Sequence, residues 1–365
     1  MMNTCSHIFR ACSLVALACL MCLPAARAQQ ISSLPYYPDA LGVSAPFAGL
    51  IGDRLVVGGG CNFPDVPVAD GGKKAFYDNV YVLDLAQPAE WQTETPLPAP
   101  LAYGATAQTA DGLVCIGGQS VDGSKTDVYL MKSSADSLSY EVLPSLPVAI
   151  DNGGAVSIGR TVYVTGGQQS DGGCGLFALD FDNPTAWQRL TDYPGRVRQQ
   201  PVVLTANGKL YLLGGFVLDK EYNVCHMPTE VLAYDPATAA WTEEGQLPPD
   251  GEGKTRCLVG GAGVAVNGRL IVTGGVNAAI FKSAVEGYGP EDYLRRPAAW
   301  YRFNADILIF DTQRKTWRAI PNVDGMNRAG GALVYHNGTL IMVCGELKPG
   351  IRSPQVTAVT LPKLP

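Results

Sequence analysis

The sequence predicts an all-β fold, a six-bladed β-propeller built from four-stranded antiparallel sheets. Three observations predict it: a recurring apolar segment that ends in paired glycines, a hairpin turn before each copy, and an aromatic residue after it. The sixth copy is degenerate, because Cys344 replaces its first glycine. The second glycines of the copies are Gly59, Gly118, Gly167, Gly215, Gly275 and Gly345.

Each of the first five repeats contains the signals for four strands. The segment before the paired glycines is itself preceded by an apolar run and a turn, as in 201–208 and 262–268. Asn-Gly turns such as Asn207-Gly208 favour tight hairpins, because both residues accept positive φ. A third strand follows, for example 78–84 or 230–235. The fourth strand carries the aromatic residue, which is Trp91, Tyr140, Trp187, Trp241 or Trp317.

The last repeat lacks a fourth strand, because the sequence ends soon after its third strand at 355–361. An unassigned segment, 31–35, carries the Leu-Pro ending that closes other repeats, as at Leu97-Pro98. We therefore predict that 31–35 completes blade six. Such closure removes the unpaired sheet edges that would otherwise template aggregation.

The first 28 residues have the features of a secretory signal. Arg10 precedes an apolar run from Cys12 to Leu23, and Ala26-Arg27-Ala28 fits the cleavage rule. The predicted domains are therefore a signal peptide at 1–28 and a single propeller at 29–365, with export across an inner membrane to the periplasm. A lipoprotein anchored at Cys19 or Cys22 is the alternative, but the residues before either cysteine fit it poorly.

Composition excludes several classes of partner and cofactor. Without residues 1–28, 25 basic residues face 33 acidic ones, a balance of −8 that argues against nucleic acid and anionic membrane surfaces. The six cysteines beyond the signal are scattered without metal-ligand spacing, so we expect no metal, although Cys174 and Cys225 are candidates for a disulfide. We expect no cofactor and no stable membrane insertion. The sequence does not determine the oligomeric state.

Propeller topology brings polar residues to one face. In an antiparallel blade, the residue before the first strand and the residue after the paired glycines lie at the same end of the channel. One alone is more often a loop-capping residue, but a ring of them suits a polar ligand such as a sugar. The predicted ring contains Asn62, Gln119, Gln168, Asn277 and Glu346 after the glycines, and Asn152, Arg198, Gln199, Gln200 and Asn327 or Arg328 before the first strands.

Loop lengths single out Glu346 among these positions. The connection after the second strand is long in blade one, from Cys61 to Tyr77, and longest in blade five, from Val276 to about Phe303. Both blades neighbour blade six once the ring closes, so both loops should flank the loop from Glu346 to Arg352. An isolated Glu/Arg pair is usually a solvated surface pair, but long ordered loops usually serve function.

The repeat resembles the kelch repeat over essentially the whole chain after the signal. The sequence also resembles the secreted kelch-type N-acetylneuraminate epimerases, or sialic acid mutarotases. The resemblance rests on Gly345-Glu346-x-Lys348-Pro349-Gly350-x-Arg352, 272–281, Pro46-Phe47-Ala48-Gly49 and 58–65. In better-known members the first motif lies mid-chain, so this chain resembles a cyclically permuted member. Cys61 and Cys344 depart from the family pattern.

The resemblance implies that Glu346 is the catalytic acid/base and that Arg352 binds the substrate. Interconversion of the sialic acid anomers opens the ring by proton transfer, which one tuned carboxylate can perform. The substrate carboxylate needs a cation, for which Arg352 is the first candidate and Arg198 the second. The predicted binding set is completed by Asn62, Asn277 and Gln200.

Other functions remain open at this level. A lectin-like protein, a protein-binding kelch ring without catalysis, and a mutarotase of another sugar all share the predicted fold. A copper radical oxidase would need several histidine and tyrosine ligands, and only His226 and His336 follow the signal. A sialidase would show repeated Ser-x-Asp-x-Gly-x-x-Trp boxes, which the sequence lacks.

Overall fold

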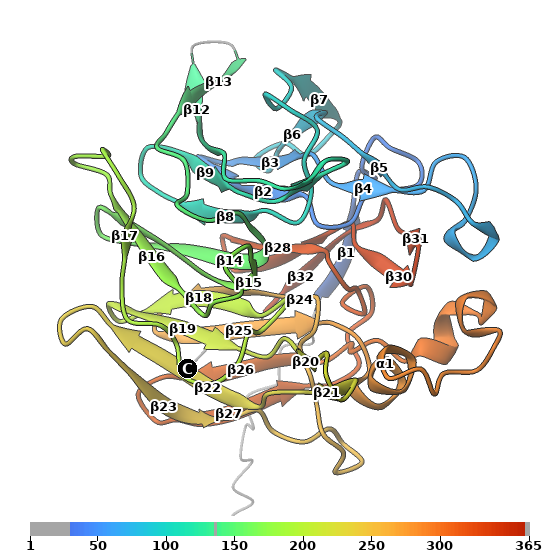
Figure 1. Ribbon diagram of the computed structural model, residues 1–365. Coiled ribbons are helices and arrows are strands. Elements are labelled where there is room, and N and C mark those ends of the chain that lie inside the picture. Colours follow the sequence, from blue (N-terminus) through green and yellow to red (C-terminus); the bar gives the residue numbers. More distant parts are fainter. Residues whose placement is uncertain (1–29, 135–136, 362–365) are drawn as a thin grey trace, which may run out of the picture.

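The computed structural model, which describes residues 30–134 and 137–361, confirms a ring of six four-stranded antiparallel sheets (Figure 1). From the channel outwards, the blades are β2 (Phe47–Ile51), β3 (Arg54–Gly58), β6 (Val80–Asp84) and β7 (Trp91–Glu94); β8 (Ala105–Gln108), β9 (Leu113–Ile116), β12 (Val128–Ser134) and β13 (Ser137–Val142); β14 (Ile150–Ile158), β15 (Thr161–Gln169), β16 (Leu176–Asp180) and β17 (Gln188–Arg189); β18 (Val202–Ala206), β19 (Lys209–Leu213), β22 (Glu230–Asp235) and β23 (Ala240–Gln246); β24 (Gly261–Val266), β25 (Arg269–Gly274), β26 (Ile307–Asp311) and β27 (Thr316–Ile320); and β28 (Ala332–His336), β29 (Thr339–Val343), β32 (Val356–Thr360) and β1 (Gln30–Leu34).

The innermost strands form a closed circle. Each of β2, β8, β14, β18, β24 and β28 contacts the innermost strand of the next blade, and β28 contacts β2. The ring therefore closes after six blades.

The predicted closing strand is present. β1 pairs antiparallel with β32, from Gln30 opposite Thr360 to Leu34 opposite Val356. The indole nitrogen of Trp91 in blade one then donates a hydrogen bond to the carbonyl of Pro35, at 2.9 Å. The N-terminal strand thus completes blade six and also fastens it to blade one. The predicted signal peptide, residues 1–28, lies outside the described residues.

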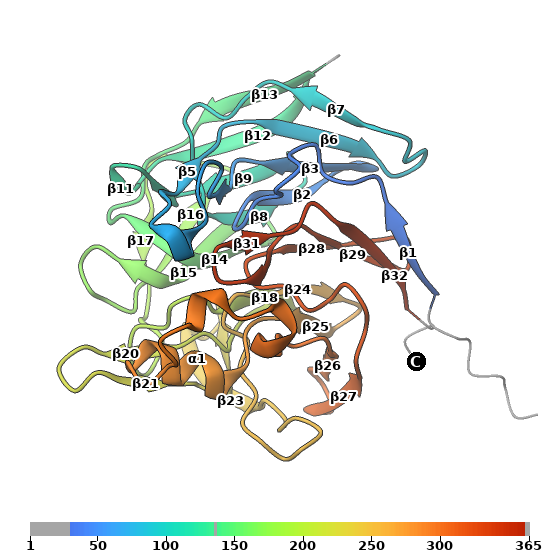
Figure 2. The same cartoon turned by 90° about the vertical axis from the view of Figure 1, so that its right-hand side faces the viewer.

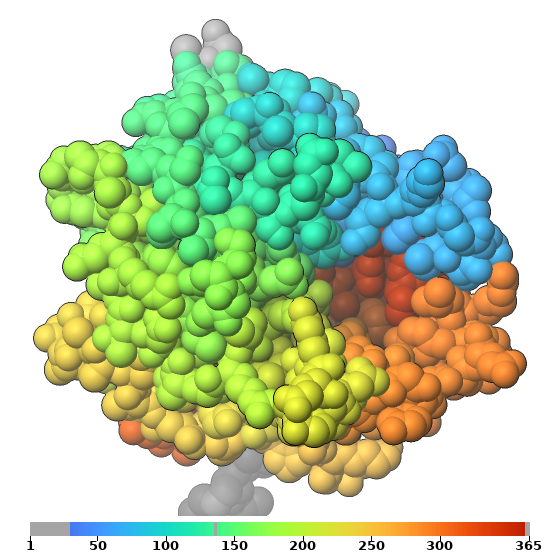
Figure 3. Space-filling model, viewed as in Figure 1, coloured from blue at the N-terminus to red at the C-terminus, as the bar shows by residue number. Residues whose placement is uncertain are grey.

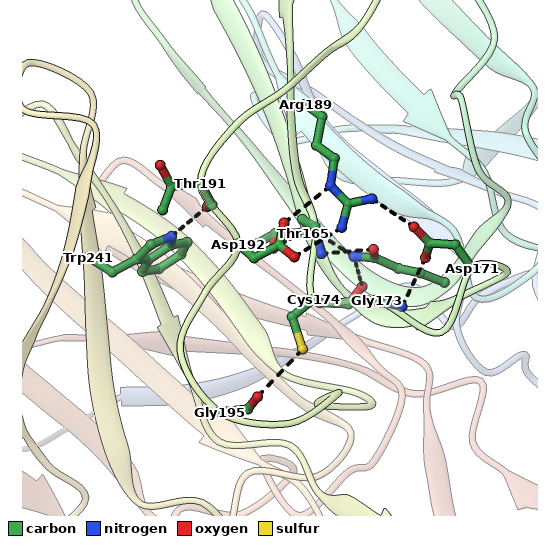
Figure 4. A network of polar contacts seen from close by, with 12 residues as sticks. Thr165, Asp171, Gly173, Cys174, Arg189, Thr191, Asp192, Gly195 and Trp241 are labelled. Carbon is green, nitrogen blue, oxygen red and sulfur yellow. Dashed lines mark hydrogen bonds and ion pairs between the residues drawn. The ribbon is translucent and has the colours of Figure 1, made fainter.

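The hydrophobic core is divided among the blade interfaces. Buried apolar side chains of the described residues form clusters that each join two neighbouring blades, such as Val164 with Ile116 between blades two and three. The fourth-strand aromatics reinforce these interfaces from the rim. Trp241 of blade four, for example, donates to the carbonyl of Thr191, beside Arg189, which pairs with Asp171 and Asp192 (Figure 4).

One face of the ring carries most of the additional structure (Figures 1 and 2). Short hairpins follow the second strands of blades one, two, four and six: β4 (Cys61–Asn62) with β5 (Ala75–Phe76), β10 (Gln119–Ser120) with β11 (Gly123–Ser124), β20 (Val217–Asp219) with β21 (Val224–His226), and β30 (Glu346–Lys348) with β31 (Ile351–Arg352). The 3-10 helix η1 (Val68–Asp70) lies in the blade-one loop, and the blade-five loop contains α1 (Ala278–Val285), η2 (Tyr293–Arg295) and η3 (Ala298–Tyr301). These loops shape the candidate site.

The paired glycines of blade one lie one residue later than predicted. In every blade, two consecutive residues at or near the end of the second strand have positive φ, and in blade one these are Gly59 and Gly60, directly after β3. A Cβ on Gly60 would lie 2.8 Å from Val43 Cβ, so the position has no room for a larger residue. The predicted pair, Gly58-Gly59, is corrected to Gly59-Gly60, because Gly58 still pairs with Val80 within the sheet.

Two further findings bear on the predictions. The six cysteines among the described residues are free thiols, so Cys174 and Cys225 form no disulfide in this structure. Within residues 30–134 and 137–361, no helix is long and apolar enough to cross a membrane.

Candidate functional site

A cavity of about 310 Å³ opens at the loop-bearing end of the channel. Figure 3 shows the hollow between the blade-one loop in blue, the blade-five loop in orange and the β20–β21 hairpin in yellow. Every blade contributes to its wall, whose polar side chains are Ser44, Tyr103, Asn152, Gln200, Tyr293 and Glu346. Of the predicted polar ring, Asn152, Gln200 and Glu346 line this cavity.

The wall is built on one equivalent position in each blade, the residue with positive φ just before the innermost strand or, in blade three, near its start. These residues are Ala45, Tyr103, Asn152, Gln200, Gly260 and Gly330, with φ between 52° and 66°. Backbone hydrogen bonds join them around the channel: Ala45 N to Gly330 O, Tyr103 N to Ala45 O, Asn152 N to Tyr103 O, Gln200 N to Asn152 O, and Gly330 N to Gly260 O, at 2.6–3.0 Å.

This left-handed ring has a polar half and an open half. Blades two, three and four place a phenol and two amides there, whereas blades five, six and one place two glycines and an alanine. A left-handed conformation costs about 1 kcal/mol or more for Tyr103 and Gln200, which lack the freedom of glycine. Strain of this kind concentrates at functional sites, and here it holds polar side chains at the edge of an open space.

A second equivalent position, immediately after the paired positive-φ residues, supplies the acid. It is occupied by Cys61, Gln119, Gln168, Phe216, Val276 and Glu346. Each of these residues lies beside the residue just before the left-handed position of its own blade, as Glu346 lies beside Ala329. Glu346 is the acid of this set, and its carboxyl lines the cavity.

The surroundings of Glu346 oppose its ionisation in part. Burial raises the pKa of the Glu346 carboxyl, whereas Arg352, Lys74 and the backbone N–H of Gly350 act in the opposite direction. Its side chain keeps 21% of its surface exposed, so a ligand in the cavity can reach it. A carboxyl of this kind can exchange protons closer to neutral pH than an ordinary glutamate.

Arg352 lies behind Glu346. Its Nη2 donates to Glu346 Oε1 at 2.7 Å, its side chain is 2% exposed, and its guanidinium carbon lies 4.9 Å from the centre of the Phe63 ring. Its Nε and Nη1 are buried without a hydrogen-bond partner among the described residues. Because Arg352 is buried, already paired with Glu346 and absent from the cavity wall, the geometry supports a role in positioning Glu346 and does not support the direct ligand contact expected from the sequence.

The two long loops flank the β30–β31 hairpin, as predicted. On the blade-five side, Lys348 Nζ donates to the carbonyls of Leu294 and Arg296, at 3.3 and 2.7 Å. On the blade-one side, Gly350 packs so closely that a Cβ there would lie 2.2 Å from Val68 Cγ1. The loops also meet each other, since Arg295 Nη2 pairs with Asp70 Oδ1 at 2.7 Å. Glu346 is thus held from both sides.

Two of the predicted binding residues lie one position out of register. Asn62 follows Cys61, and Asn277 follows Val276, and it is Cys61 and Val276 that occupy the position of Glu346. Adjacent residues of an extended chain point to opposite sides, so both asparagines turn away from the cavity. Asn62 instead donates to Gly42 O and accepts from Tyr77 Oη, and Asn277 caps α1 by accepting from Ile280 N.

The other two predicted residues differ in their placement. Arg198 is buried, donates to Glu230 O and Oε2 at 3.3 Å, and does not line the cavity. Its predicted role as second choice for the substrate carboxylate is therefore not supported by the geometry. Gln200 lines the cavity as predicted and donates through Nε2 to Asn152 Oδ1 at 3.2 Å.

Sequence reasoning missed Tyr103 and the aromatic residues of the blade-five loop. Phe281, Tyr293 and Phe303 form an apolar wall next to Glu346 and Pro349. Tyr103 occupies the left-handed position of blade two. The signal was present, because Tyr103 precedes Gly104 and the inner strand just as Asn152 precedes Gly153.

Within the described ranges, no group of three or more His, Cys, Asp or Glu side chains is arranged to hold a metal ion. The side chains of the cavity wall supply one carboxyl, two amides, two phenols, one aliphatic hydroxyl and an apolar surface.

Comparison with known proteins decides the family. The N-acetylneuraminate epimerase family model matches residues 143–364, which is more than half of the chain. The chain belongs to the N-acetylneuraminate epimerase family. It is 30% identical over 231 residues to the N-acetylneuraminate epimerase of Haemophilus influenzae (strain 86-028NP), covering 60% of this chain and 59% of the relative.

A second relative of this family and one solved structure are similar to the chain. The N-acetylneuraminate epimerase of Pasteurella multocida (strain Pm70) is 31% identical over 233 residues, covering 60% of this chain and 59% of the relative. The matches thus span about three-fifths of the relatives' length. A solved structure, "Structure of YjhT", superposes with a TM-score of 0.66 at 16% identity, covering 91% of this chain and 98% of that one, and supports the propeller fold.

Proposed function

We propose that this chain interconverts the α- and β-anomers of N-acetylneuraminate by acid/base-assisted ring opening. The observation that carries the proposal is Glu346, a reachable carboxyl with a raised pKa, held at the cavity wall by Arg352. The names of the relatives point to the same substrate.

The reaction needs little more than one mobile proton. The carboxylate of Glu346 accepts the proton of the anomeric hydroxyl while the bond from the anomeric carbon to the ring oxygen breaks, which forms a ketone. The ring oxygen takes up the proton that Glu346 returns. Rotation about the bond next to the ketone then presents its other face. The hydroxyl attacks this face, gives its proton to Glu346, and the former ketone oxygen receives that proton from Glu346, which completes the opposite anomer. A carboxyl whose pKa lies nearer to the working pH performs both transfers better than an ordinary glutamate.

The rest of the wall suits a sugar acid. Asn152 and Gln200 offer amide donors and acceptors, and Phe281, Tyr293 and Phe303 offer apolar surface. A volume of about 310 Å³ is at the lower end of small-molecule sites, which favours a single monosaccharide over a chain of sugars.

The test is to follow freshly released α-N-acetylneuraminate by NMR, with the wild type, with Glu346→Gln and with Glu230→Gln. Glu230 is a matched control, because it pairs with the buried Arg198 away from the cavity. We expect the wild type and Glu230→Gln to accelerate anomerisation and Glu346→Gln to lose at least about a hundredfold, as for a general acid/base.

The same assay separates the alternatives. Equal anomerisation with and without the wild-type protein refutes the enzyme. Binding of N-acetylneuraminate that persists without catalysis identifies a lectin-like protein. Acceleration confined to another sugar identifies a different mutarotase. No binding of any sugar refutes the sugar-dependent functions and leaves the protein-binding ring to be tested.

We also propose that residues 1–28 direct export to the periplasm. The support is the basic, apolar and small-residue pattern of that segment. Mass spectrometry of protein from a periplasmic fraction should find an N-terminus at Gln29. An uncut N-terminus in the cytoplasmic fraction refutes the proposal, and a lipid-modified Cys19 or Cys22 establishes the lipoprotein alternative.

A further inference from the structure

The cavity contains no built-in cation, although the proposed substrate is an anion. Among the described residues, no lysine or arginine lines it. In the part of the chain that the structure describes, two cations bond to side chains of the wall: Arg352 to Glu346, and Lys74 to Tyr103. The charge of Arg352 is opposed by Glu346, and its side chain is 2% exposed, so it is poorly placed to receive a second carboxylate. Lys74 is the remaining candidate.

Lys74 lies near the end of the blade-one loop, where its side chain is exposed. Its Nζ donates to Tyr103 Oη at 2.8 Å and lies 4.6 Å from the centre of the phenol ring. Within the described part of the chain it forms no ion pair, so two of its three N–H groups and its whole charge are available. It also lowers the pKa of Glu346, which places its charge within electrostatic reach of the proposed acid/base.

Tyr103 links Lys74 to the cavity. Its phenol lines the cavity and is fixed there by the left-handed backbone at φ 60°. The oxygen accepts from Lys74, and the thiol of Cys61 lies 3.3 Å from it, but sulfur is a weak donor and a weak acceptor. The hydroxyl hydrogen is therefore free to bond to an oxygen in the cavity. Burial raises the pKa of Tyr103, so the hydroxyl keeps that hydrogen at neutral pH.

We propose that Lys74 and Tyr103 together bind the carboxylate of the sugar acid, in place of Arg352. One carboxylate oxygen accepts from the Tyr103 hydroxyl, and the other accepts from the Lys74 ammonium. The two donors are adjacent in the structure. In N-acetylneuraminate the carboxylate is attached to the anomeric carbon. Binding it here therefore brings the anomeric hydroxyl close to Glu346, which shares the cavity wall with Tyr103.

This inference rests on the proposed function, so its test compares two ligands. N-acetylneuraminate carries the carboxylate, and its methyl ester is neutral at that group. We would measure anomerisation rates by NMR and, independently, binding of the equilibrated ligands by calorimetry. The variants are Lys74→Gln, Lys74→Arg and Tyr103→Phe, with Lys73→Gln as the matched control, because Lys73 is the adjacent exposed lysine.

We expect Lys74→Gln to raise KM and Kd for the acid by about tenfold to a hundredfold, the range for a charged hydrogen bond, and to change those for the ester by less than about threefold. Lys74→Arg should restore most of the affinity, because it keeps the charge. Tyr103→Phe should weaken acid binding by about threefold to thirtyfold. Lys73→Gln should behave as the wild type.

Unchanged affinity of Lys74→Gln for the acid, or an equal loss for acid and ester, overturns the proposal while leaving catalysis by Glu346 intact. If the wild type binds the acid without accelerating anomerisation, the proposed function fails, and the effect of Lys74→Gln on Kd still decides the binding role. If the wild type binds neither ligand, both proposals are refuted.

Discussion

Replacing Arg352 by Met tests whether this arginine supports Glu346 or binds the ligand. The substitution removes the guanidinium that lies 2.7 Å from Glu346 and over the Phe63 ring, and it keeps a side chain of comparable length in a buried site. The structure predicts two effects, one on stability and one on the ionisation of Glu346.

The expected loss of stability is modest, because opposing contributions partly cancel. Removing one partner of a buried ion pair costs about 3–5 kcal/mol, and a desolvated cation–π contact adds about 2 kcal/mol. Against this, Nε and Nη1 of Arg352 have no partners among the described residues, and their removal recovers about 1–3 kcal/mol each. The net prediction is a decrease of about 2 kcal/mol in the free energy of unfolding, measured in urea.

The second effect distinguishes the two roles. Arg352 holds down the pKa of Glu346, so its loss leaves burial to raise that pKa further. Fewer carboxyls are then ionised at neutral pH, and the acidic limb of kcat/KM should move to higher pH. Arg256→Met is the matched control, because Arg256 is 5% exposed and pairs with Asp306 at 2.9 Å away from the cavity. It should lose stability without moving the pH profile.

An unchanged pH profile together with a large increase in KM for the acid, but not for its methyl ester, would refute this reasoning. That result would show that Arg352 contacts the substrate carboxylate, as the family resemblance implies.

Three further predictions concern the site and the closure of the ring. Burial raises the pKa of Glu346 above its ordinary 4.5, so the folded protein holds this proton more tightly than the unfolded chain does. The free energy of unfolding of the wild type should therefore fall relative to that of Glu346→Gln as pH rises from about 4.5 through the folded pKa. A difference in urea stability that is constant from pH 4 to 8 contradicts this. Deleting the chain through Leu34 should leave β32 as an open edge and cause aggregation on heating, and a truncated protein that stays monomeric with an unchanged Tm would contradict the closing role of β1. Lys348→Met removes two hydrogen bonds to the blade-five loop and should speed proteolysis between residues 286 and 303 at least about threefold, with little change in Tm; equal cleavage rates would show that Lys348 does not anchor the loop.

The sequence predicted the architecture correctly because the repeat is a local pattern. Paired glycines, degenerate in the sixth copy, recur at spacings of about fifty to seventy residues, with rim aromatics in the first five blades and Asn-Gly turns in the last three. The sixth repeat lacked a fourth strand, which the segment near the N-terminus could supply. The flanking of Glu346 by the two long loops also followed, because neighbouring blades in a closed ring must be adjacent. The cyclic permutation relative to better-known family members stays a prediction.

The sequence was less reliable for single side chains at the cavity. Blade one contains three consecutive glycines, and only backbone conformation shows that Gly59 and Gly60 are the repeat pair. With the pair at Gly59-Gly60, Cys61 takes the position equivalent to Glu346, and the predicted Asn62 lies one residue beyond it. No local pattern shows which two of Gly58, Gly59 and Gly60 form the pair, because all three are glycine.

The sequence by itself determined the six-fold repeat, the strand that closes the ring and the position of one carboxyl at the channel mouth. Only the tertiary structure decided which charges that mouth presents: Arg352 is buried behind Glu346, and Lys74 reaches Tyr103 from another loop. The physical reason is that strand periodicity and turn chemistry act between near neighbours in the chain, whereas burial and charge pairing depend on loops brought together by the closed ring.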